Sequence, residues 1–139
     1  MDKVKVTAYV ERGKGKRNFA CWVKEDIDKC GLAGYGGTAH EAMENIKVTV
    51  EEYKEIKAGE GKEFPDVEFE YKLDIGSFFD YYPVDVTAFA KYIGMNASVL
   101  RQYVAGLRTP KPEQVEKFRK GVQKFSNDLA SGLQVTVIP

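Results

Sequence analysis

Four polar side chains within one short stretch of the chain have the donor and acceptor groups needed to read DNA bases. Arg101 can donate two hydrogen bonds to guanine, and Asn96 or Gln102 can bond two groups of adenine at once. Ser98 adds a hydroxyl group, and Ala97 lies between it and Asn96. We expect these residues, Ala97 included, to face base edges or nearby phosphates, which requires a helix that presents them together on one exposed side.

The surrounding residues predict such a helix as the second half of a helix-turn-helix. The first helix is expected over residues 86–93, followed by Gly94, where glycine can take the positive φ that ends a helix without a steric cost. Met95 should fill the corner, and Asn96 is a favoured N-cap for the second helix. The apolar residues expected to face inward recur at helical spacing, namely Phe89, Ala90, Ile93, Val99, Leu100 and Tyr103.

Two features of this stretch favour DNA binding over an ordinary helical hairpin in a small bundle. Ala90 lies four residues before Gly94, where two helices cross closely and a larger side chain would separate them. The second helix also divides its polar residues from Leu100 and Tyr103, so that one side can pack on the domain while the other enters a major groove. The hairpin remains the alternative that this stretch leaves open.

The charge distribution places the helix-turn-helix in the basic half of the chain. The 139 residues carry no net charge, but residues 1–74 hold 13 basic and 16 acidic side chains, a balance of −3. Residues 75–139 hold 8 basic and 5 acidic side chains, a balance of +3, which suits phosphate binding. Three basic residues near the motif are expected to contact phosphates: Lys91, Arg108 and Lys111.

The N-terminal half has the pattern of a small β-sheet. Apolar and polar residues alternate over residues 4–10, over the returning segment 18–25 and over residues 67–74, as is typical of half-buried strands. A short further strand is expected over residues 32–35, between glycines. These segments predict a small antiparallel sheet.

One long helix should cover a face of this sheet. Thr38 and Glu41 form a capping box at its start, and the helix should end near Gly59. The complete prediction is an α+β fold. Residues 1–74 form β-β-β-α-β with an antiparallel sheet and a packed helix, and residues 75–139 form an all-α helix-turn-helix domain.

Three further segments complete the C-terminal half. Residues 75–82 are short and strongly aromatic, and we interpret them as a helix at the joint between the halves. Another helix should begin at Pro112, and Leu129 should be the last residue of its apolar side. Residues 133–138 alternate as a strand does, and a strand must pair with the N-terminal sheet or with another subunit. This pattern favours a homodimer or a higher homo-oligomer.

Composition excludes several classes of protein. No apolar run approaches the roughly 20 residues that span a bilayer, and the first residues lack the pattern of a signal peptide, so we expect a cytoplasmic protein with no membrane partner. Cys21, Cys30 and the single His40 cannot make a four-ligand zinc site. We therefore expect no metal and no cofactor.

Over nearly its whole length the chain resembles the HicB family of antitoxins. The N-terminal likeness, to a partial ribonuclease H-like domain, rests on Ala20-Cys21-Trp22-Val23, on the run from Cys30 to Thr38, and on Glu41-Ala42. The C-terminal likeness, to a repressor-like helix-turn-helix, rests on Phe89-Ala90, Gly94-Met95-Asn96, Leu100-Arg101-Gln102-Tyr103 and Gly106. One departure is Gly37, which stands where the family usually has an acidic residue.

The resemblance implies a protein with two activities. Its N-terminal domain would bind and block a HicA-like toxin, a small messenger RNA ribonuclease, and its C-terminal domain would bind double-stranded operator DNA as an oligomer and repress the shared operon. An acidic half that bears aromatic side chains can cover a basic RNA-binding surface, because opposite potentials steer and orient such a pair. The candidate toxin contacts are Trp22, Asp26, Asp28 and Tyr35.

Two other functions compete with this interpretation. A ribonuclease H-like nuclease needs several carboxylates converging on two metal ions, and the inward positions of the predicted strands are apolar, while Glu68 and Glu70 alternate with apolar neighbours. We therefore expect no catalytic residue and no enzymatic activity. An orphan transcription regulator without a toxin remains open, since one sequence does not reveal its neighbouring gene.

Overall fold

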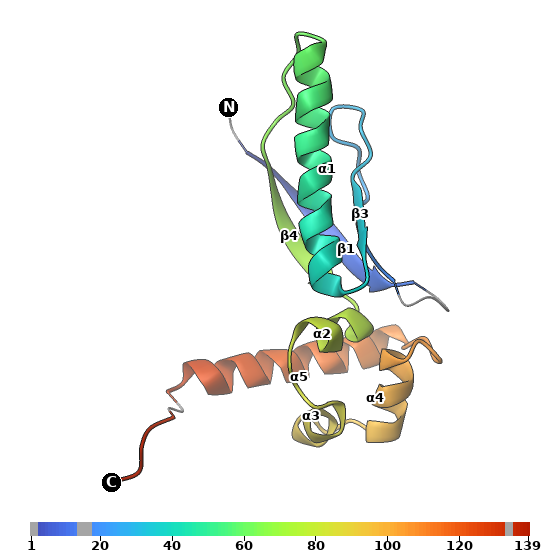
Figure 1. The fold of residues 1–139 in the computed structure, drawn as a ribbon. Helices are drawn as coiled ribbons and strands as arrows, with labels where there is room; N and C mark the ends of the chain where they lie inside the picture. Colours follow the sequence, from blue (N-terminus) through green and yellow to red (C-terminus); the bar gives the residue numbers. More distant parts are fainter. Residues whose placement is uncertain (1–2, 14–17, 133–134) are drawn as a thin grey trace. The chain divides into compact units, whose positions relative to one another are not determined.

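The chain forms two compact units, residues 1–83 and residues 84–139 (Figure 1). In this computed structural model the described residues are 3–13, 18–132 and 135–139. The first unit is a four-stranded sheet with helices, and the second is helical. The predicted α+β class and the order β-β-β-α-β followed by helices are confirmed.

The sheet of the first unit has the strand order β3-β2-β1-β4. Its strands are β1 (Val4–Arg12), β2 (Phe19–Val23), β3 (Ala33–Gly36) and β4 (Val67–Leu73). Strand β2 pairs antiparallel with β1 and with β3, but β4 pairs parallel with β1. The sheet is therefore mixed, where the sequence pattern predicted an antiparallel one. The long helix between β3 and β4 carries the chain back along the sheet, so β4 runs in the same direction as β3 and β1.

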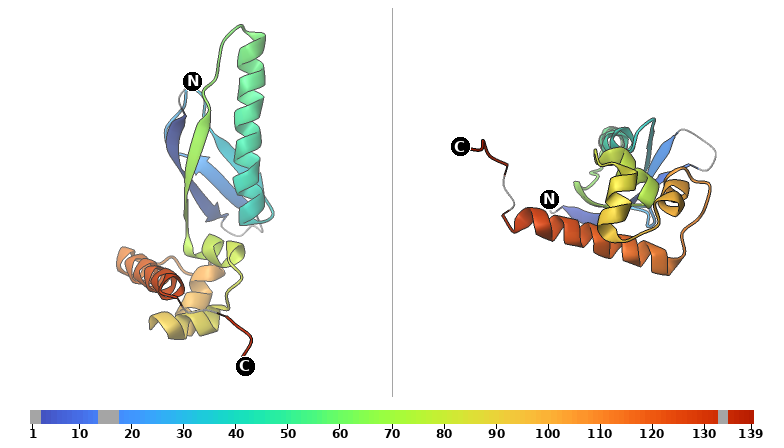
Figure 2. Two further views of the ribbon diagram at one scale, coloured as in Figure 1. Left: turned by 90° about the vertical axis from the view of Figure 1, so that its left-hand side faces the viewer. Right: turned by 90° about the horizontal axis from the view of Figure 1, so that it is seen from below.

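That helix, α1 (Ala39–Gly59), covers one face of the sheet (Figure 2). It begins with the predicted cap, in which the Glu41 amide donates to Thr38 Oγ1 at 3.0 Å, but the Glu41 carboxylate accepts from the Gly37 amide at 2.8 Å, one residue before the Thr38 amide that a capping box uses. It also lies directly on β3: a Cβ added at Gly34 would come within 2.4 Å of the Ile46 nitrogen. The core between helix and sheet is formed by apolar side chains, among them Ala8, Val10, Phe19, Cys21, Val23, Ala42, Ile46 and Val50.

Polar groups of α1 close the outer edge of β3. Asn45 Oδ1 accepts from the Tyr35 amide at 2.9 Å, and Thr49 Oγ1 donates to the Ala33 carbonyl at 3.0 Å. These two side chains are four residues apart, so they lie on one side of the helix. An edge strand otherwise offers such groups to other chains.

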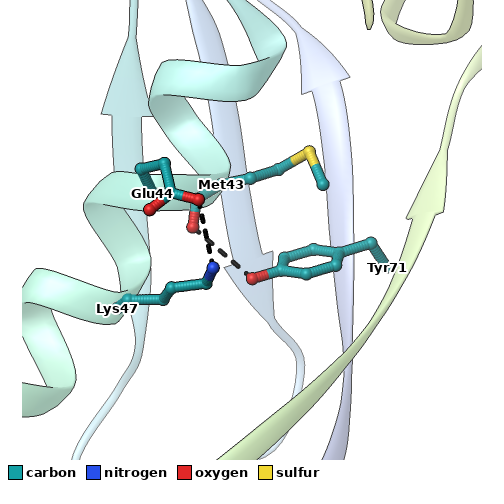
Figure 3. A network of polar contacts seen from close by, with 4 residues as sticks. All are labelled: Met43, Glu44, Lys47 and Tyr71. Carbon is teal, nitrogen blue, oxygen red and sulfur yellow. Dashed lines mark hydrogen bonds and ion pairs between the residues drawn. The ribbon is translucent and has the colours of Figure 1, made fainter.

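A second contact joins α1 to β4, the strand at the opposite edge of the sheet from β3 (Figure 3). The Tyr71 hydroxyl of β4 donates to the Met43 carbonyl at 3.5 Å, beside an exposed ion pair of Lys47 and Glu44 at 3.0 Å. Burial raises the pKa of Tyr71 to about 12, so the phenol stays protonated at neutral pH. This arrangement holds the helix to the fourth strand.

The short helix α2 (Ile75–Tyr81) belongs to the first compact unit. Asp74 caps it by accepting from the Ser77 amide at 2.8 Å, and Asp80 accepts from the amide of Ala39 at the start of α1 at 2.7 Å. The division between the units consequently falls after Pro83, whereas the sequence pattern grouped residues 75–82 with the C-terminal half.

The second unit consists of α3 (Val86–Ile93), α4 (Ala97–Val104) and α5 (Pro112–Ala130). Its buried side chains include Phe89, Ala90, Met95, Leu100 and Phe118. Aromatic rings join α3 to α5, with the Phe89 ring 5.9 Å from that of Phe118 and 5.6 Å from that of Phe125. Pro112 occupies the first turn of α5, as predicted.

The predicted C-terminal strand is not formed within the part of the chain that the structure describes, and its pairing with another subunit stays a prediction. Leu133 and Gln134 lie outside the described residues, and residues 135–139 have no regular secondary structure and are exposed. A strand requires hydrogen bonds from a neighbouring strand, and the sheet of the described chain contains no partner for this segment. Separately, none of the helices in the described ranges combines the length and apolar character that crossing a bilayer requires.

Candidate DNA-binding and protein-binding surfaces

Helices α3 and α4 form the predicted helix-turn-helix corner. Gly94 ends α3 with φ 75°, and Met95 at the corner is buried, with its amide bonded to the Ala90 carbonyl at 2.9 Å. Ala90 itself is fully buried. Asn96 caps α4, because its Oδ1 accepts from the Val99 amide at 3.0 Å. The local signals in the sequence are confirmed at each of these positions.

Helix α4 presents two different sides. Leu100 is fully buried and Tyr103 is half-buried, which fixes the helix on its unit. Ser98 and Arg101 are exposed, whereas Ala97 and Gln102 are half-buried. A fixed helix with an exposed polar side is the arrangement that entry into a major groove requires.

Arg101 is held from the neighbouring helix. Its Nη1 donates to the Thr87 Oγ1 of α3 at 2.8 Å, while the side chain as a whole remains exposed. The sequence analysis did not identify Thr87, because the contact joins residues 14 positions apart and depends on how two helices cross. The sequence feature that could have indicated this contact is a threonine in the first turn of the first helix, followed by an arginine in the second helix.

The cap formed by Asn96 restricts what this residue can read. Bonding two groups of adenine requires both the oxygen and the nitrogen of the amide. Because Oδ1 already accepts from the Val99 amide, Asn96 could bond both groups of adenine only if Oδ1 accepted a second hydrogen bond through its other lone pair. The Asn96 amide nitrogen is not used by the cap, and Arg101 uses one of its five N–H donors for Thr87.

The three predicted phosphate contacts are exposed and come from different segments. Lys91 lies in the last turn of α3, Arg108 in the connection after α4, and Lys111 at the N-cap position of α5. Lys111 makes no side-chain cap bond, so its ammonium group is not used to begin the helix.

Part of the charge on α5 is used within the unit. Arg119 pairs with Glu116, with Nη2 2.6 Å from Oε1, and this hydrogen bond lowers the pKa of the Glu116 carboxyl. Lys124 Nζ lies 4.2 Å from the centroid of the Tyr92 ring. The Tyr92 hydroxyl donates to Asp128, which raises the pKa of the phenol to about 12. The contacts of Tyr92 with Lys124 and Asp128 connect α3 to α5, whereas the Arg119–Glu116 pair lies within α5. Among the described residues, the side chains of α4 form no ion pair.

In the first unit, the face of the sheet opposite α1 carries aromatic side chains. Cys21 and Gly34 face the helix, so their neighbours Trp22 and Tyr35 face the other way. Tyr9 pairs directly with Trp22 across the strands, with ring centroids 5.0 Å apart, and 66% of Tyr35 is exposed. We call Tyr9, Trp22 and Tyr35 the aromatic face. Sequence reasoning missed Tyr9, although the alternation along the first strand already placed it outward.

Asp26 and Asp28 lie apart from the aromatic face. They follow β2 in a turn closed by the bridge between Ile27 and Cys30, and both are exposed. Asp28 has φ 50° and lies with its Oδ2 3.9 Å from Lys57 Nζ. Together with Glu25 and Glu63, the two aspartates line an acidic hollow beside apolar residues, namely Val4, Val6, Ile27 and Pro65. The four predicted toxin contacts thus form two separate pairs.

The carboxylates on the sheet do not converge. Glu68 and Glu70 of β4 are exposed. Among the residues that the structure describes, no group of three or more His, Cys, Asp and Glu side chains is placed to hold a metal ion.

Comparison of the chain with protein-family models, with curated proteins and with solved structures gives no match.

Proposed function

We propose that this protein is an antitoxin of the HicB type, which binds operator DNA through α3 and α4 and neutralises a small HicA-like ribonuclease through its first unit. The observation that supports DNA binding most directly is the geometry of α4. Leu100 anchors the helix, while Arg101 and Ser98 remain exposed on its other side. This division of faces is shared by amphipathic surface helices in general, and it is the arrangement that lets a recognition helix enter a major groove while it stays packed on its unit.

Charge and symmetry extend the proposal. The exposed Lys91, Arg108 and Lys111 can contact phosphates, which would supply affinity independent of sequence. A homodimer would present two copies of α4 about 34 Å apart to a near-palindromic site. The protein would act in the cytoplasm, where its operon is transcribed.

The aromatic face and the acidic hollow support the protein-binding activity. Large exposed aromatic side chains are typical anchors of protein interfaces. Asp26 and Asp28 can steer a basic partner, since complementary potentials raise the rate of encounter. A ribonuclease that binds RNA has such a basic surface, so covering it would block access to the substrate.

Two experiments test the proposal. Co-expression with the product of the adjacent gene, followed by purification through a tag on one protein, should yield a complex in which ribonuclease activity is suppressed. A mobility-shift assay should show binding to the duplex upstream of the gene pair and weaker binding to an unrelated duplex. If the DNA binds but no adjacent product co-purifies, the protein is an orphan regulator. If neither binds, the proposal is wrong.

A further inference from the structure

We propose that Thr87 is a positioning residue for DNA recognition: its hydroxyl group holds the Arg101 guanidinium in the orientation that reads one guanine. The inference rests on the proposed DNA binding by α4 and adds a determinant of specificity that lies outside the recognition helix. It starts from a single contact, in which Arg101 Nη1 donates to Thr87 Oγ1 at 2.8 Å.

The two helices give this contact a rigid base. Thr87 lies in the first turn of α3, and Arg101 lies in α4 beside Leu100, which is fully buried. Thr87 is half-buried and β-branched, so its side chain has few alternative rotamers. The hydroxyl oxygen can therefore occupy only a few positions, which restricts the long and flexible side chain that donates to it.

The contact leaves Arg101 able to bind DNA. A guanidinium group has five N–H donors and no acceptor, and one donor points to Thr87. The remaining four include the pair needed for two bonds to the O6 and N7 atoms of guanine. Among the described residues no carboxylate forms an ion pair with Arg101, so its charge is not neutralised within the chain.

Fixing the side chain before binding should raise specificity. An exposed arginine samples many rotamers, and immobilising such a side chain on binding opposes association. If Thr87 has already restricted Arg101, binding costs less side-chain conformational entropy at the base pair that matches the held orientation. The advantage applies to that base pair only, because binding to phosphates elsewhere does not use the held geometry.

The test compares two substitutions at Thr87 in the full-length chain. Thr87→Val keeps the shape and removes the acceptor, whereas Thr87→Ser keeps the hydroxyl and serves as the matched control. The probe is a duplex selected from a randomised library by the wild-type protein, together with a variant duplex in which the base pair read by Arg101 is changed. Arg101→Ala identifies that base pair as the position at which discrimination is lost.

We expect Thr87→Val to bind the selected duplex about three- to tenfold more weakly and to lose most discrimination at that base pair. Binding to unrelated duplexes, the salt dependence of binding and the melting temperature should stay as in the wild type. Thr87→Ser should restore discrimination. In an Arg101→Ala background, Thr87→Val should have no further effect, because the contact that it removes is already absent.

A second measurement needs no DNA. Nitrogen-15 relaxation at the Arg101 Nε of the free protein should report a less mobile side chain in the wild type and in Thr87→Ser than in Thr87→Val.

Three results would overturn the inference. Thr87→Val could discriminate as the wild type does, or it could weaken all duplexes equally, which would make Thr87 a phosphate contact. Equal mobility of Arg101 in the three proteins would also contradict it. If the wild-type protein selects no preferred duplex from the library, the proposed DNA binding itself is wrong. In the other three results the wild type does select a duplex, and only the role of Thr87 is contradicted.

Discussion

Gly121 of α5 lies directly against Ile93 of α3, and a Cβ added at Gly121 would come within 2.4 Å of Ile93 Cγ2 and 2.6 Å of its Cβ. Gly121 is buried, and it has no positive φ, so the glycine is required for space. Ile93 is β-branched, and the atoms that would be met lie near its backbone, so it has little freedom to move away. The close approach of α3 and α5 thus depends on a residue without a side chain.

We predict that Gly121→Ala destabilises the protein. Alanine favours a helix by up to about 1 kcal/mol over glycine, but overpacking a well-packed contact costs roughly 1–3 kcal/mol, so the net change should be a loss. Chemical denaturation followed by circular dichroism measures it. Gly59→Ala is the matched control, since nothing lies within 4 Å of a Cβ at the end of α1, and it should be neutral or stabilising. Equal behaviour of the two variants would contradict the packing argument.

A second prediction concerns the pH dependence of stability. Burial raises the pKa of Cys21 from 9.0 to about 12. In the unfolded chain this thiol ionises near its ordinary pKa, whereas the folded chain keeps its proton. Stability should therefore be unaffected by Cys21 below pH 9 and fall as pH rises from about 9 towards 12, by at most about 1.4 kcal/mol per pH unit.

Denaturation of the wild type and of Cys21→Ala at a series of pH values between 8 and 10.5 separates this contribution. Burial and the charge of ionised Cys21 both raise the pKa of Tyr71, so the phenol does not cancel in this difference and the comparison is repeated with Tyr71→Phe in both proteins. The wild type should lose stability more steeply above pH 9 than the variant. If the free energy of unfolding falls with pH equally in the two proteins, Cys21 has the same pKa in the folded and unfolded chains.

The features that the sequence predicted correctly are local ones. The Gly94 amide donates to carbonyls of the preceding turn, and the side chains of Asn96, Thr38 and Glu41 accept from amides within a few residues of themselves. Alternation of apolar residues also identified three of the strands, because burial of one face imposes a period of two, and flanking glycines indicated the fourth, β3. Such signals depend on little beyond the chain segment that contains them.

What the sequence did not reveal depends on the placement of distant segments. The parallel pairing of β4 follows from the path of the whole helix before it, and the attachment of α2 follows from the bond of Asp80 to Ala39. At the candidate DNA-binding surface, the contact of Thr87 with Arg101 requires the crossing of two helices to be known. The exposed side of α4 was predictable from its pattern, but the partner of its arginine was not.

A third prediction addresses the closed edge of β3. Asn45→Ala and Thr49→Val together remove the partners of the Tyr35 amide and the Ala33 carbonyl. Because an unpaired strand edge invites pairing with other chains, the double variant should associate at lower protein concentration than the wild type. Light scattering over a concentration series measures this. Glu52→Ala, at an exposed position of α1, is the control and should behave as the wild type.

A fourth prediction concerns the aromatic face and follows from the proposed toxin binding. Tyr35→Ala should leave stability nearly unchanged, because most of its side chain is exposed, but should weaken binding of the adjacent-gene product by about 2 kcal/mol or more if it is an anchor. Asp26→Asn should instead slow association and reduce its salt dependence. Titration calorimetry and stopped-flow mixing measure the two effects. Ile56→Ala, on α1 and 56% exposed, is the control, and equal weakening by it would contradict an interface on the aromatic face.

The last prediction separates base reading from phosphate binding in the second unit. Arg101→Ala should cost about 1–3 kcal/mol on the preferred duplex and relax specificity at one base pair, because Arg101 lies on the exposed side of α4. Lys111→Ala should weaken binding to all duplexes by a similar factor and reduce the slope of log affinity against log salt by about 1, because it removes one released counterion. Fluorescence anisotropy at several salt concentrations measures both quantities. If Arg101→Ala changes only the salt slope, or if Lys111→Ala changes only the sequence preference, the two roles have been assigned to the wrong residues.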